Sequence, residues 1–172
     1  MARAVVHAST VALGEAGVLV RGPAGSGKTT LALALVAHHE ARGIFARLVA
    51  DDWTAIEAAG GRLLGSAPAS IAGLVEIRGE GIVPVESLSA VRLTHLVDLV
   101  PEARAPRMPE ELERQATLSD IVLSRIVLPA RNSAVAALVV ASVLDRNGLT
   151  GRGHGSQRSA AIRAGRFGED DR

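Results

Sequence analysis

Apolar and polar positions alternate in several short runs of this chain, which predicts a protein rich in strands. Residues 4–13 are apolar and β-branched, residues 14–17 have turn composition, and residues 18–21 complete a predicted hairpin. The clearest alternation is VRLTHLVDLV at residues 91–100, which predicts a long strand. Further apolar runs typical of strands lie at 47–50, 53–58, 62–64, 71–77, 82–83 and 121–128, the second and third of them forming another hairpin.

Two stretches have helical composition, so the chain is expected to be an α/β protein. One begins near residue 28 with a run of Ala and Leu and ends near Gly43, a plausible C-terminal cap. The other covers residues 131–144. From Asp145 onward the chain is rich in Gly, Arg and Ser, which predicts a folded domain over 1–145 and a flexible tail over 146–172. The alternative for the tail is a basic arm that docks a partner.

Composition excludes several classes of function. The 172 residues suit one domain, and 19 basic against 18 acidic side chains do not favour nucleic-acid binding. Cysteine is absent, so disulfides and thiolate metal sites are excluded, and a reducing cytoplasm is expected. The N-terminus does not resemble a signal peptide. The longest apolar run, 134–144, is too short to span a membrane.

The segment GPAGSGKT at residues 22–29 fits the phosphate-loop pattern G-x-x-x-x-G-K-[ST], with an apolar strand before it and a helix after it. Its backbone N–H groups form an anion site at a helix N-terminus. Lys28 can reach the β- and γ-phosphates of a nucleotide, and the Thr29 hydroxyl can bind Mg²⁺. A glycine-rich turn without a ligand is the alternative, which the Lys and Thr in register disfavour. The residues expected to contact the nucleotide are Gly22, Pro23, Ala24, Gly25, Ser26, Gly27, Lys28, Thr29 and Thr30.

A carboxylate is expected beside the phosphate loop, and Asp51 and Asp52 directly follow the predicted strand 47–50. Because successive side chains of a strand alternate in direction, only one of the two can face the loop, and the other is expected to be structural. An ordinary turn that begins with Asp-Asp is the alternative.

Four further polar residues are candidates for the same site. Glu76 lies within the apolar run LVEI, where burial of an unpaired carboxylate is costly, and a surface ion pair with Arg78 is the alternative. His7 lies in an apolar strand, where packing alone would also explain it. Arg104 and Arg107, in the proline-rich loop after the long strand, can supply positive charge to a transferring phosphoryl group, or lie on the surface.

Together, HAS…GVLVRGPAGSGKTTLALAL…LVADD…LVEIRGEGI resembles the catalytic domain of HPr kinase/phosphorylase over residues 6–144, and its short alphaproteobacterial members in particular. The resemblance implies a P-loop kinase fold like that of PEP carboxykinase, with a mixed, partly antiparallel sheet. It implies a cytoplasmic enzyme that uses ATP and Mg²⁺ to phosphorylate a serine of the phosphocarrier protein HPr. Phosphorolysis with inorganic phosphate, which releases pyrophosphate, would reverse the reaction and so regulate carbohydrate metabolism and the phosphotransferase system. Family members form rings, commonly hexamers.

The resemblance also assigns roles to single residues. Asp52 matches the carboxylate that accepts a proton in phosphorylation and returns it in the reverse reaction, with Asp51 beside it. Thr29 and Glu76 match the ligands of Mg²⁺. The positions that match the family's catalytic residues are His7, Lys28, Asp51, Asp52 and Arg107. Residues 129–132 fall at a motif tied to dephosphorylation, although this segment is two residues shorter than in the family, and RGEGI replaces RGLGI.

Two other functions remain open from the sequence. One is a small-molecule kinase with an arginine-bearing lid at residues 101–111, which would turn over without a protein partner. The other is a nucleotide-dependent switch or sensor, which would bind nucleotide tightly and turn it over very slowly.

Overall fold

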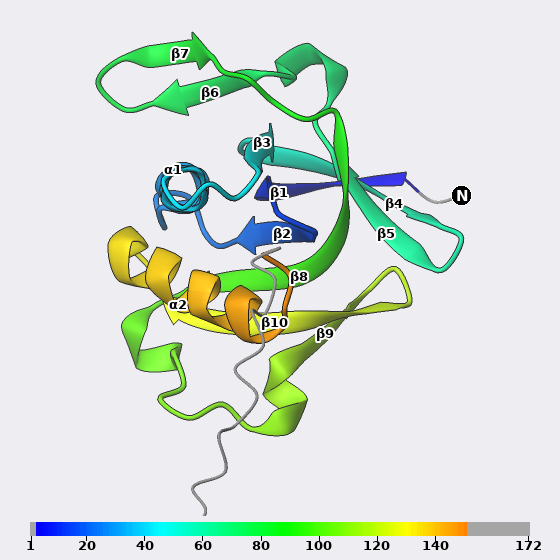
Figure 1. Cartoon of the computed structure of the whole chain (residues 1–172), viewed down its shortest axis with the longest axis vertical. Coiled ribbons are helices and arrows are strands. Elements are labelled where there is room, and N and C mark those ends of the chain that lie inside the picture. Colours follow the sequence, from blue (N-terminus) through cyan, green and yellow to red (C-terminus); the bar gives the residue numbers. More distant parts are fainter. Residues whose placement is uncertain (1–2, 151–172) are drawn as a thin grey trace, which may run out of the picture.

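Figure 1 shows an α/β domain built around one large mixed sheet. The computed structural model describes residues 3–150, with β1 and β2 forming the predicted first hairpin and β4 and β5 the second. The strands are β1 (Arg3–Leu13), β2 (Ala16–Arg21), β3 (Ala46–Ala50), β4 (Trp53–Ala59), β5 (Arg62–Ser66), β6 (Leu74–Ile77), β7 (Gly81–Pro84), β8 (Ala90–Val100), β9 (Gln115–Leu118) and β10 (Ile121–Pro129). The helices are α1 (Lys28–Glu40) and α2 (Ser133–Arg146), with 3₁₀ turns at Ala69–Ile71, Glu102–Arg104 and Glu111–Arg114.

The sheet has eight strands and is mixed, which confirms the predicted class. Its order is β2-β1-β4-β5-β8-β10-β9, with β3 paired to β1 and an additional pairing between β2 and β8. β8 runs parallel to β2 and β10 and antiparallel to β5. Because β8 pairs with both β2 and β5, strands β2, β1, β4, β5 and β8 close into a ring. β6 and β7 form a separate two-stranded sheet.

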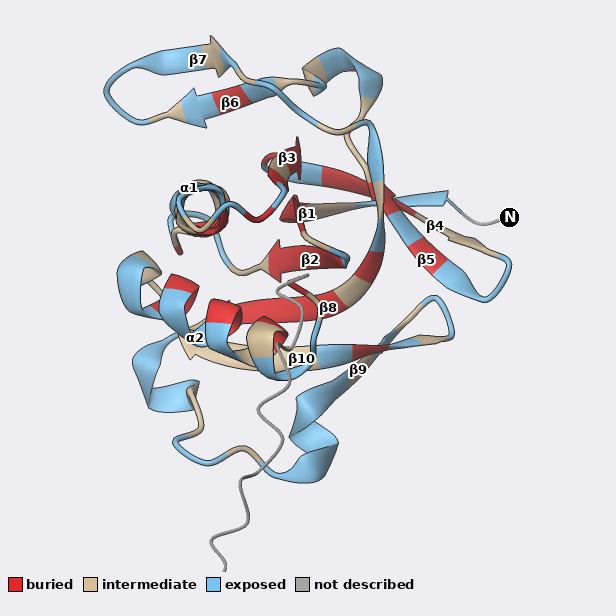
Figure 2. Cartoon of the chain, viewed as in Figure 1, coloured by how far each residue is buried: buried red, intermediate tan, exposed pale blue. Residues whose placement is uncertain are grey.

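The alternation along the central strands places an apolar cluster on each face of the sheet. In β2, Val18 and Val20 pack in the cluster that includes α1 and α2, whereas Leu19 between them packs in the second cluster. Figure 2 shows that buried positions concentrate on the central strands. The helices therefore cover one face, and the second cluster fills the space enclosed by the other.

Helix α1 begins where the sequence predicts and positions the phosphate loop. Gly27 precedes it with a left-handed φ of 96°, and Gly43 follows its end with a φ of 70°. Leu31 and Leu35, one turn apart, are buried against the sheet. The loop between β2 and α1 is thus held between a central strand and a packed helix.

Three expectations differ from the structure. Strand β9 was not predicted, because it is only four residues long and turns into β10 through Ser119 and Asp120, whose φ values of 48° and 61° usually call for glycine or asparagine. Of residues 71–77, only Leu74–Ile77 form a strand. Helix α2 begins at Ser133 and not at residue 131, where the φ of Arg131 is 65°.

The predicted flexible tail begins too early. Helix α2 continues to Arg146, and the Thr150 hydroxyl, in a buried residue, donates a hydrogen bond of 2.6 Å to Asp145 Oδ1. The backbone N–H of Leu149 also bonds to the Leu144 carbonyl. Residues 146–150 therefore pack on the domain. The rest of the predicted tail, 151–172, lies outside the described residues. No helix in the described part of the chain has the length and apolar character needed to cross a bilayer.

Candidate active site

The loop of residues 22–27 joins β2 to α1 in a conformation that requires glycine. A Cβ on Gly22 would lie 2.6 Å from Ser26 Oγ and 2.9 Å from the Leu99 carbonyl oxygen, closer than real Cβ contacts allow. Gly25 and Gly27 have φ values of 71° and 96°, which side chains disfavour. The loop therefore curls tightly over the end of β8, with its N–H groups at the start of a helix.

Two buried polar groups in this loop lack strong partners, which fits an anionic ligand. Lys28 is 6% exposed, and its Nζ lies 3.3 Å from the Gly22 carbonyl oxygen and 3.5 Å from that of Pro23. Within residues 3–150 it forms no ion pair, and the buried Ser26 hydroxyl has no hydrogen-bond partner. A buried ammonium is stable when an opposite charge is near, so the loop suits phosphate groups.

Asp51 and Asp52 face different partners, and both lie in the turn between β3 and β4, outside either strand. Asp51 is buried, and its Oδ1 accepts hydrogen bonds from the hydroxyls of Ser9 (2.7 Å) and Thr29 (2.8 Å). Asp52 has a left-handed φ of 61°, and its largely exposed carboxylate lies 2.6 Å from His7 Nε2. Asp51 is therefore the member of the pair that faces the phosphate loop.

His7 is held on both sides by neighbours from β4. Its ring lies 5.1 Å from the ring of Trp53, the residue opposite it in the register of β1 and β4. Its Nε2 contacts the Asp52 carboxylate at the start of the same hairpin. The half-buried imidazole is thus fixed beside the exposed carboxylate and is not simply packed in the core.

One open cleft of about 600 Å³ collects these groups. His7, Asp51 and Asp52 line it together with residues 24–25 and 27–30 of the phosphate loop and its helix. Glu76 and Arg78 reach it from the β6–β7 hairpin, and within the described residues they form no ion pair with each other. The alternative of a surface pair is therefore not supported for Glu76.

The cleft can hold Mg²⁺ with the help of a nucleotide. Between Arg3 and Thr150, no three His, Cys, Asp or Glu side chains gather into a metal site. The Thr29 hydroxyl donates its proton to Asp51, so its lone pairs stay available to a cation, and Glu76 supplies a second carboxylate. Mg²⁺ usually takes one or two carboxylates and fills its other positions with phosphate and water, so these residues fit it.

A partly buried ion-pair cluster anchors the strand that precedes the phosphate loop. Arg21, the last residue of β2, makes two hydrogen bonds with Asp98 of β8 at 2.8 and 3.0 Å, and Arg125 of β10 adds one at 2.7 Å. Burial raises the pKa of Asp98, but the hydrogen bonds and charges of the two arginines outweigh it and hold that pKa below its usual value. Three parallel strands are thereby tied together beneath the cleft.

The structure leaves two predicted segments outside the cleft lining. Arg107 and Arg104 lie exposed on the loop between β8 and β9, and neither lines the cleft. Residues 129–132 touch the back of the phosphate loop, where the Arg131 N–H donates to the Ser26 carbonyl at 2.9 Å. The Arg131 Nε also lies 3.4 Å from the Gly25 carbonyl oxygen. Arg131 thus supports the loop from outside.

Sequence reasoning missed Ser9, which contacts Asp51 directly. The spacing in the sequence could have indicated it, because Ser9 lies two residues after His7 on one strand and therefore on the same face. A serine in an apolar strand was given no role because its partner, Asp51, lies 42 residues away.

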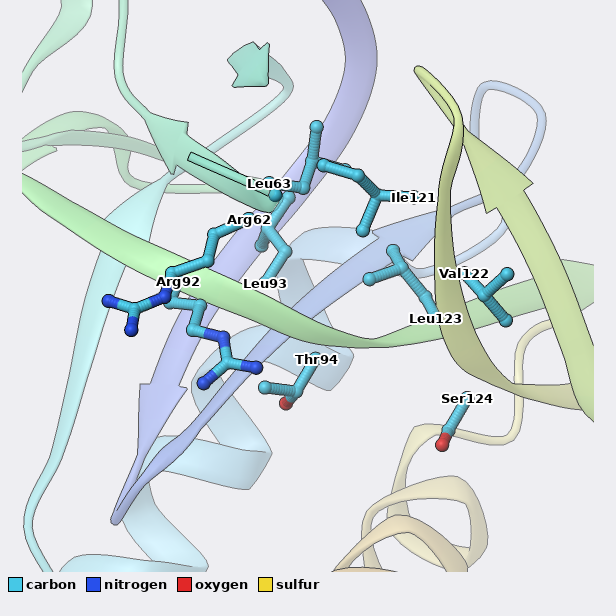
Figure 3. A pocket seen from close by; sticks show the side chains of 10 residues that line it. Arg62, Leu63, Arg92, Leu93, Thr94, Ile121, Val122, Leu123 and Ser124 are labelled. Atoms are coloured by element: carbon cyan, nitrogen blue, oxygen red, sulfur yellow. The ribbon is translucent and has the colours of Figure 1, made fainter. Parts of the chain in front are cut away.

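A second, smaller cavity lies away from the predicted residues (Figure 3). It measures about 210 Å³ and lies where β5 and β10 meet the edge of β8. Figure 3 shows the guanidinium groups of Arg62 and Arg92 on one side and residues 121–124 on the other. It contains none of the phosphate-loop or acidic residues, so the larger cleft is the candidate active site.

The chain is similar to known proteins in sequence and in fold. The family described as "HPr Serine kinase C-terminal domain" matches residues 1–161. HPr kinase/phosphorylase of Geobacillus thermodenitrificans (strain NG80-2) is 36% identical over 146 residues, which cover 78% of this chain and 45% of that protein. HPr kinase/phosphorylase of Limosilactobacillus reuteri (strain DSM 20016) is 28% identical over 151 residues, 81% of this chain and 45% of that protein.

Among solved structures, the HPr(Ser) kinase/phosphatase from Coxiella burnetii matches with a TM-score of 0.70 and 25% identity. The match covers 85% of this chain and 91% of that one. The chain spans about half the length of the curated relatives it matches.

Proposed function

The chain belongs to the HPr serine kinase C-terminal domain family, and on that premise we propose that it transfers the γ-phosphoryl group of ATP to a serine of HPr. The observation that carries the proposal is the pairing of Thr29 with Asp51 and of His7 with Asp52 in one cleft. One carboxylate is directed to the phosphate loop and the other to the open side. Such a division suits transfer from a bound nucleotide to a hydroxyl that approaches from outside.

In the proposed forward reaction, the serine oxygen forms a bond to the γ-phosphorus while the bond from that phosphorus to the bridging oxygen of ADP breaks. Asp52 accepts the serine proton, and His7 holds the Asp52 carboxylate in place. Lys28 and the loop N–H groups bind the phosphates. Thr29, Asp51 and Glu76 would hold Mg²⁺, which neutralises charge on the phosphates when bound. Positioning and electrostatics supply most of the catalysis.

The proposed reverse reaction uses the same groups. Inorganic phosphate bound at the phosphate loop attacks the phosphoserine, Asp52 returns a proton to the departing serine oxygen, and pyrophosphate and free serine result. The names of the relatives, which include phosphorylase and phosphatase, support this direction. We further propose a cytoplasmic homo-oligomer, hexameric by resemblance to the family, in which the activity regulates the phosphotransferase system.

Incubation with ATP, Mg²⁺ and purified HPr tests the proposal, with the intact mass of HPr as the readout. We expect HPr to gain the mass of one phosphoryl group and to lose it when ATP is replaced by inorganic phosphate, with release of pyrophosphate. The Lys28→Ala chain is the control. ATP turnover without any protein acceptor would favour the small-molecule kinase, and tight nucleotide binding without transfer would favour the switch.

A further inference from the structure

The Ser9 hydroxyl is the one side-chain group in the described structure that contacts both Asp51 and Asp52. Ser9 is completely buried in β1. Its Oγ donates a hydrogen bond of 2.7 Å to Asp51 Oδ1 and lies 3.4 Å from the backbone N of Asp52, whose N–H points to it. A hydroxyl has one proton to donate and lone pairs that accept, so both contacts are compatible.

At Asp51, the Ser9 contact fixes the direction of the carboxylate. Oδ1 accepts from Ser9 on one side and from Thr29 on the other, at 2.7 and 2.8 Å. Two donors on one oxygen leave that carboxylate little rotational freedom. Because the Thr29 hydroxyl donates its proton to Asp51, its lone pairs point away from Asp51 and are available to a cation. Among residues 3–150, loss of the Ser9 donor would leave Thr29 as the only side chain that holds Asp51.

At Asp52, the hydrogen bond from its N–H to Ser9 Oγ supports an unusual backbone conformation. Asp52 adopts a φ of 61°, and the Trp53 N–H donates to the Asp51 carbonyl at 2.7 Å across it, which makes a tight three-residue turn. A left-handed aspartate at a functional site persists only when its surroundings hold it there. The turn reverses the direction of the Asp52 side chain relative to Asp51 and brings it to His7.

We infer that Ser9 is a positioning residue that divides the two carboxylates between their tasks: Asp51 toward the phosphate loop and Asp52 toward the acceptor hydroxyl. The inference rests on the proposed function for the identity of the reaction, but the positioning itself belongs to the free protein. Ser9 touches neither the nucleotide-binding loop nor the open side of the cleft, so it acts only through the aspartates.

The neighbouring residue of the same strand supplies a matched control. Thr10 is also completely buried, but its hydroxyl lies 2.9 Å from that of Thr54, which in turn donates to the Ala8 carbonyl. Neither hydroxyl contacts a carboxylate. Thr10→Val therefore removes a buried hydroxyl one residue away from Ser9 without changing either aspartate contact.

The first measurement uses the free protein, without nucleotide or metal. Backbone NMR and amide hydrogen exchange follow the Asp52 N–H in the parent, Ser9→Ala, Ser9→Thr and Thr10→Val. We expect Ser9→Ala to shift the Asp52 resonance and speed its exchange, and Thr10→Val to leave both unchanged. Ser9→Thr, which keeps the hydroxyl, should retain the parent signal. If Ser9→Ala does not fold, Ser9→Cys keeps the volume with a weaker donor and should show the same direction of change.

The second measurement separates binding from turnover. Hydrogen bonds to charged groups are strong enough that Ser9→Ala should lower kcat for HPr about ten- to a hundredfold. It should also raise the Mg²⁺ concentration needed for half-saturation by a non-hydrolysable ATP analogue, with KM for HPr unchanged. Parent-like Asp52 exchange, Mg²⁺ dependence and kcat in Ser9→Ala would overturn the inference, as would equal losses in Thr10→Val. If the parent itself does not phosphorylate HPr, the proposed function fails, while the exchange and nucleotide-binding comparisons still decide the role of Ser9.

Discussion

Asp51 lies at the end of a buried strand with one oxygen fixed by two hydroxyls, whereas Arg107 lies on an exposed loop whose regular structure is limited to two 3₁₀ turns. The sequence resemblance predicts a catalytic role for both residues. The first region is held by the sheet, by α1 and by the ion pairs of Asp98. The second, residues 101–114, packs few side chains and exposes Met108 and Leu112 almost completely.

The contrast teaches that the residues proposed for phosphate binding and acid–base chemistry lie on a rigid frame. A positively charged side chain that has to contact only the transferring phosphoryl group can be supplied by a mobile loop. The predictions below test this division.

The largest effect is expected from Lys28, a buried cation of the rigid region. It is the only lysine of the chain, so amine-reactive labelling, apart from the N-terminus, reports on it alone. We expect ATP to protect Lys28 from labelling and Lys28→Ala to abolish nucleotide binding by calorimetry, because no other side chain of the loop carries a positive charge. Lys28→Arg is the control that keeps the charge. Equal labelling with and without ATP would contradict a role in phosphate binding.

The second effect separates the two aspartates within the rigid region. Asp52→Asn should lower kcat on the order of 10²–10⁴-fold, because it removes the group proposed to accept the serine proton. Asp51→Asn should act mainly on the Mg²⁺ requirement, since Asp51 contacts Thr29 and not the open side. Steady-state kinetics across Mg²⁺ concentrations distinguish the two. The opposite order of losses would exchange their roles.

The third effect concerns the loop. Arg107→Ala should leave nucleotide affinity unchanged, because Arg107 does not line the cleft, and should lower kcat for HPr at least about tenfold if the loop brings its charge to the transferring group. Arg104→Ala, on the same exposed loop, is the matched control. Equal kinetics for Arg107→Ala, Arg104→Ala and the parent would remove the loop from the reaction.

The smallest effect concerns the stability of the rigid region in acid. Burial lowers the pKa of His39 in α1 and of His95 in β8 below the usual 6.5. The unfolded chain therefore binds protons at a higher pH than the folded one, so stability is full above about pH 6.5 and falls as the pH drops below it. We expect the melting temperature to decrease between pH 7.5 and 5.5.

His39 is the better of the two histidines for a test, because its Nδ1 lies 2.7 Å from the Leu35 carbonyl and its Nε2 has no partner in residues 3–150. Glutamine cannot be charged, so His39→Gln should make the melting temperature depend less on pH. The highest melting temperature of this variant should be lower than that of the parent. His38→Gln, at the half-buried position next to it, should change the slope less than His39→Gln, because burial is the largest cause of the lowered His39 pKa. A parent-like slope in His39→Gln would assign the acid sensitivity to other groups.

Local patterns were sufficient to predict the elements that hold the rigid region. Alternation marked β1 and β8, and the glycines with Lys28 marked the phosphate loop and the start of α1. Asp51 and Asp52 were found because they follow a strand directly. In each case the signal lies within a few neighbouring residues.

Features that depend on residues far apart in the chain could not be predicted from local sequence patterns. The pairing of β8 with β2 on one side and with β5 and β10 on the other joins segments far apart in the chain. Ser9 acquires its importance only when the β1–β3 pairing brings Asp51 to it. The end of the domain was also missed, because the buried Thr150 lies within a stretch whose composition is that of a solvated tail.

Glu76 comes from a hairpin that shares no ladder with the main sheet, and this gives the cleft a thermodynamic property of its own. The Val85 N–H donates to the Gly73 carbonyl and closes the base of the hairpin. The hairpin is joined to the main sheet through the Leu88 N–H, which donates to the Leu48 carbonyl, and through the buried side chain of Val75. If Glu76 helps to hold Mg²⁺ and nucleotide as proposed, nucleotide affinity and hairpin order are linked quantities. A molecule that binds only the ordered hairpin would then raise the affinity for nucleotide by some factor. By reciprocity, nucleotide would raise the affinity for that molecule by the same factor.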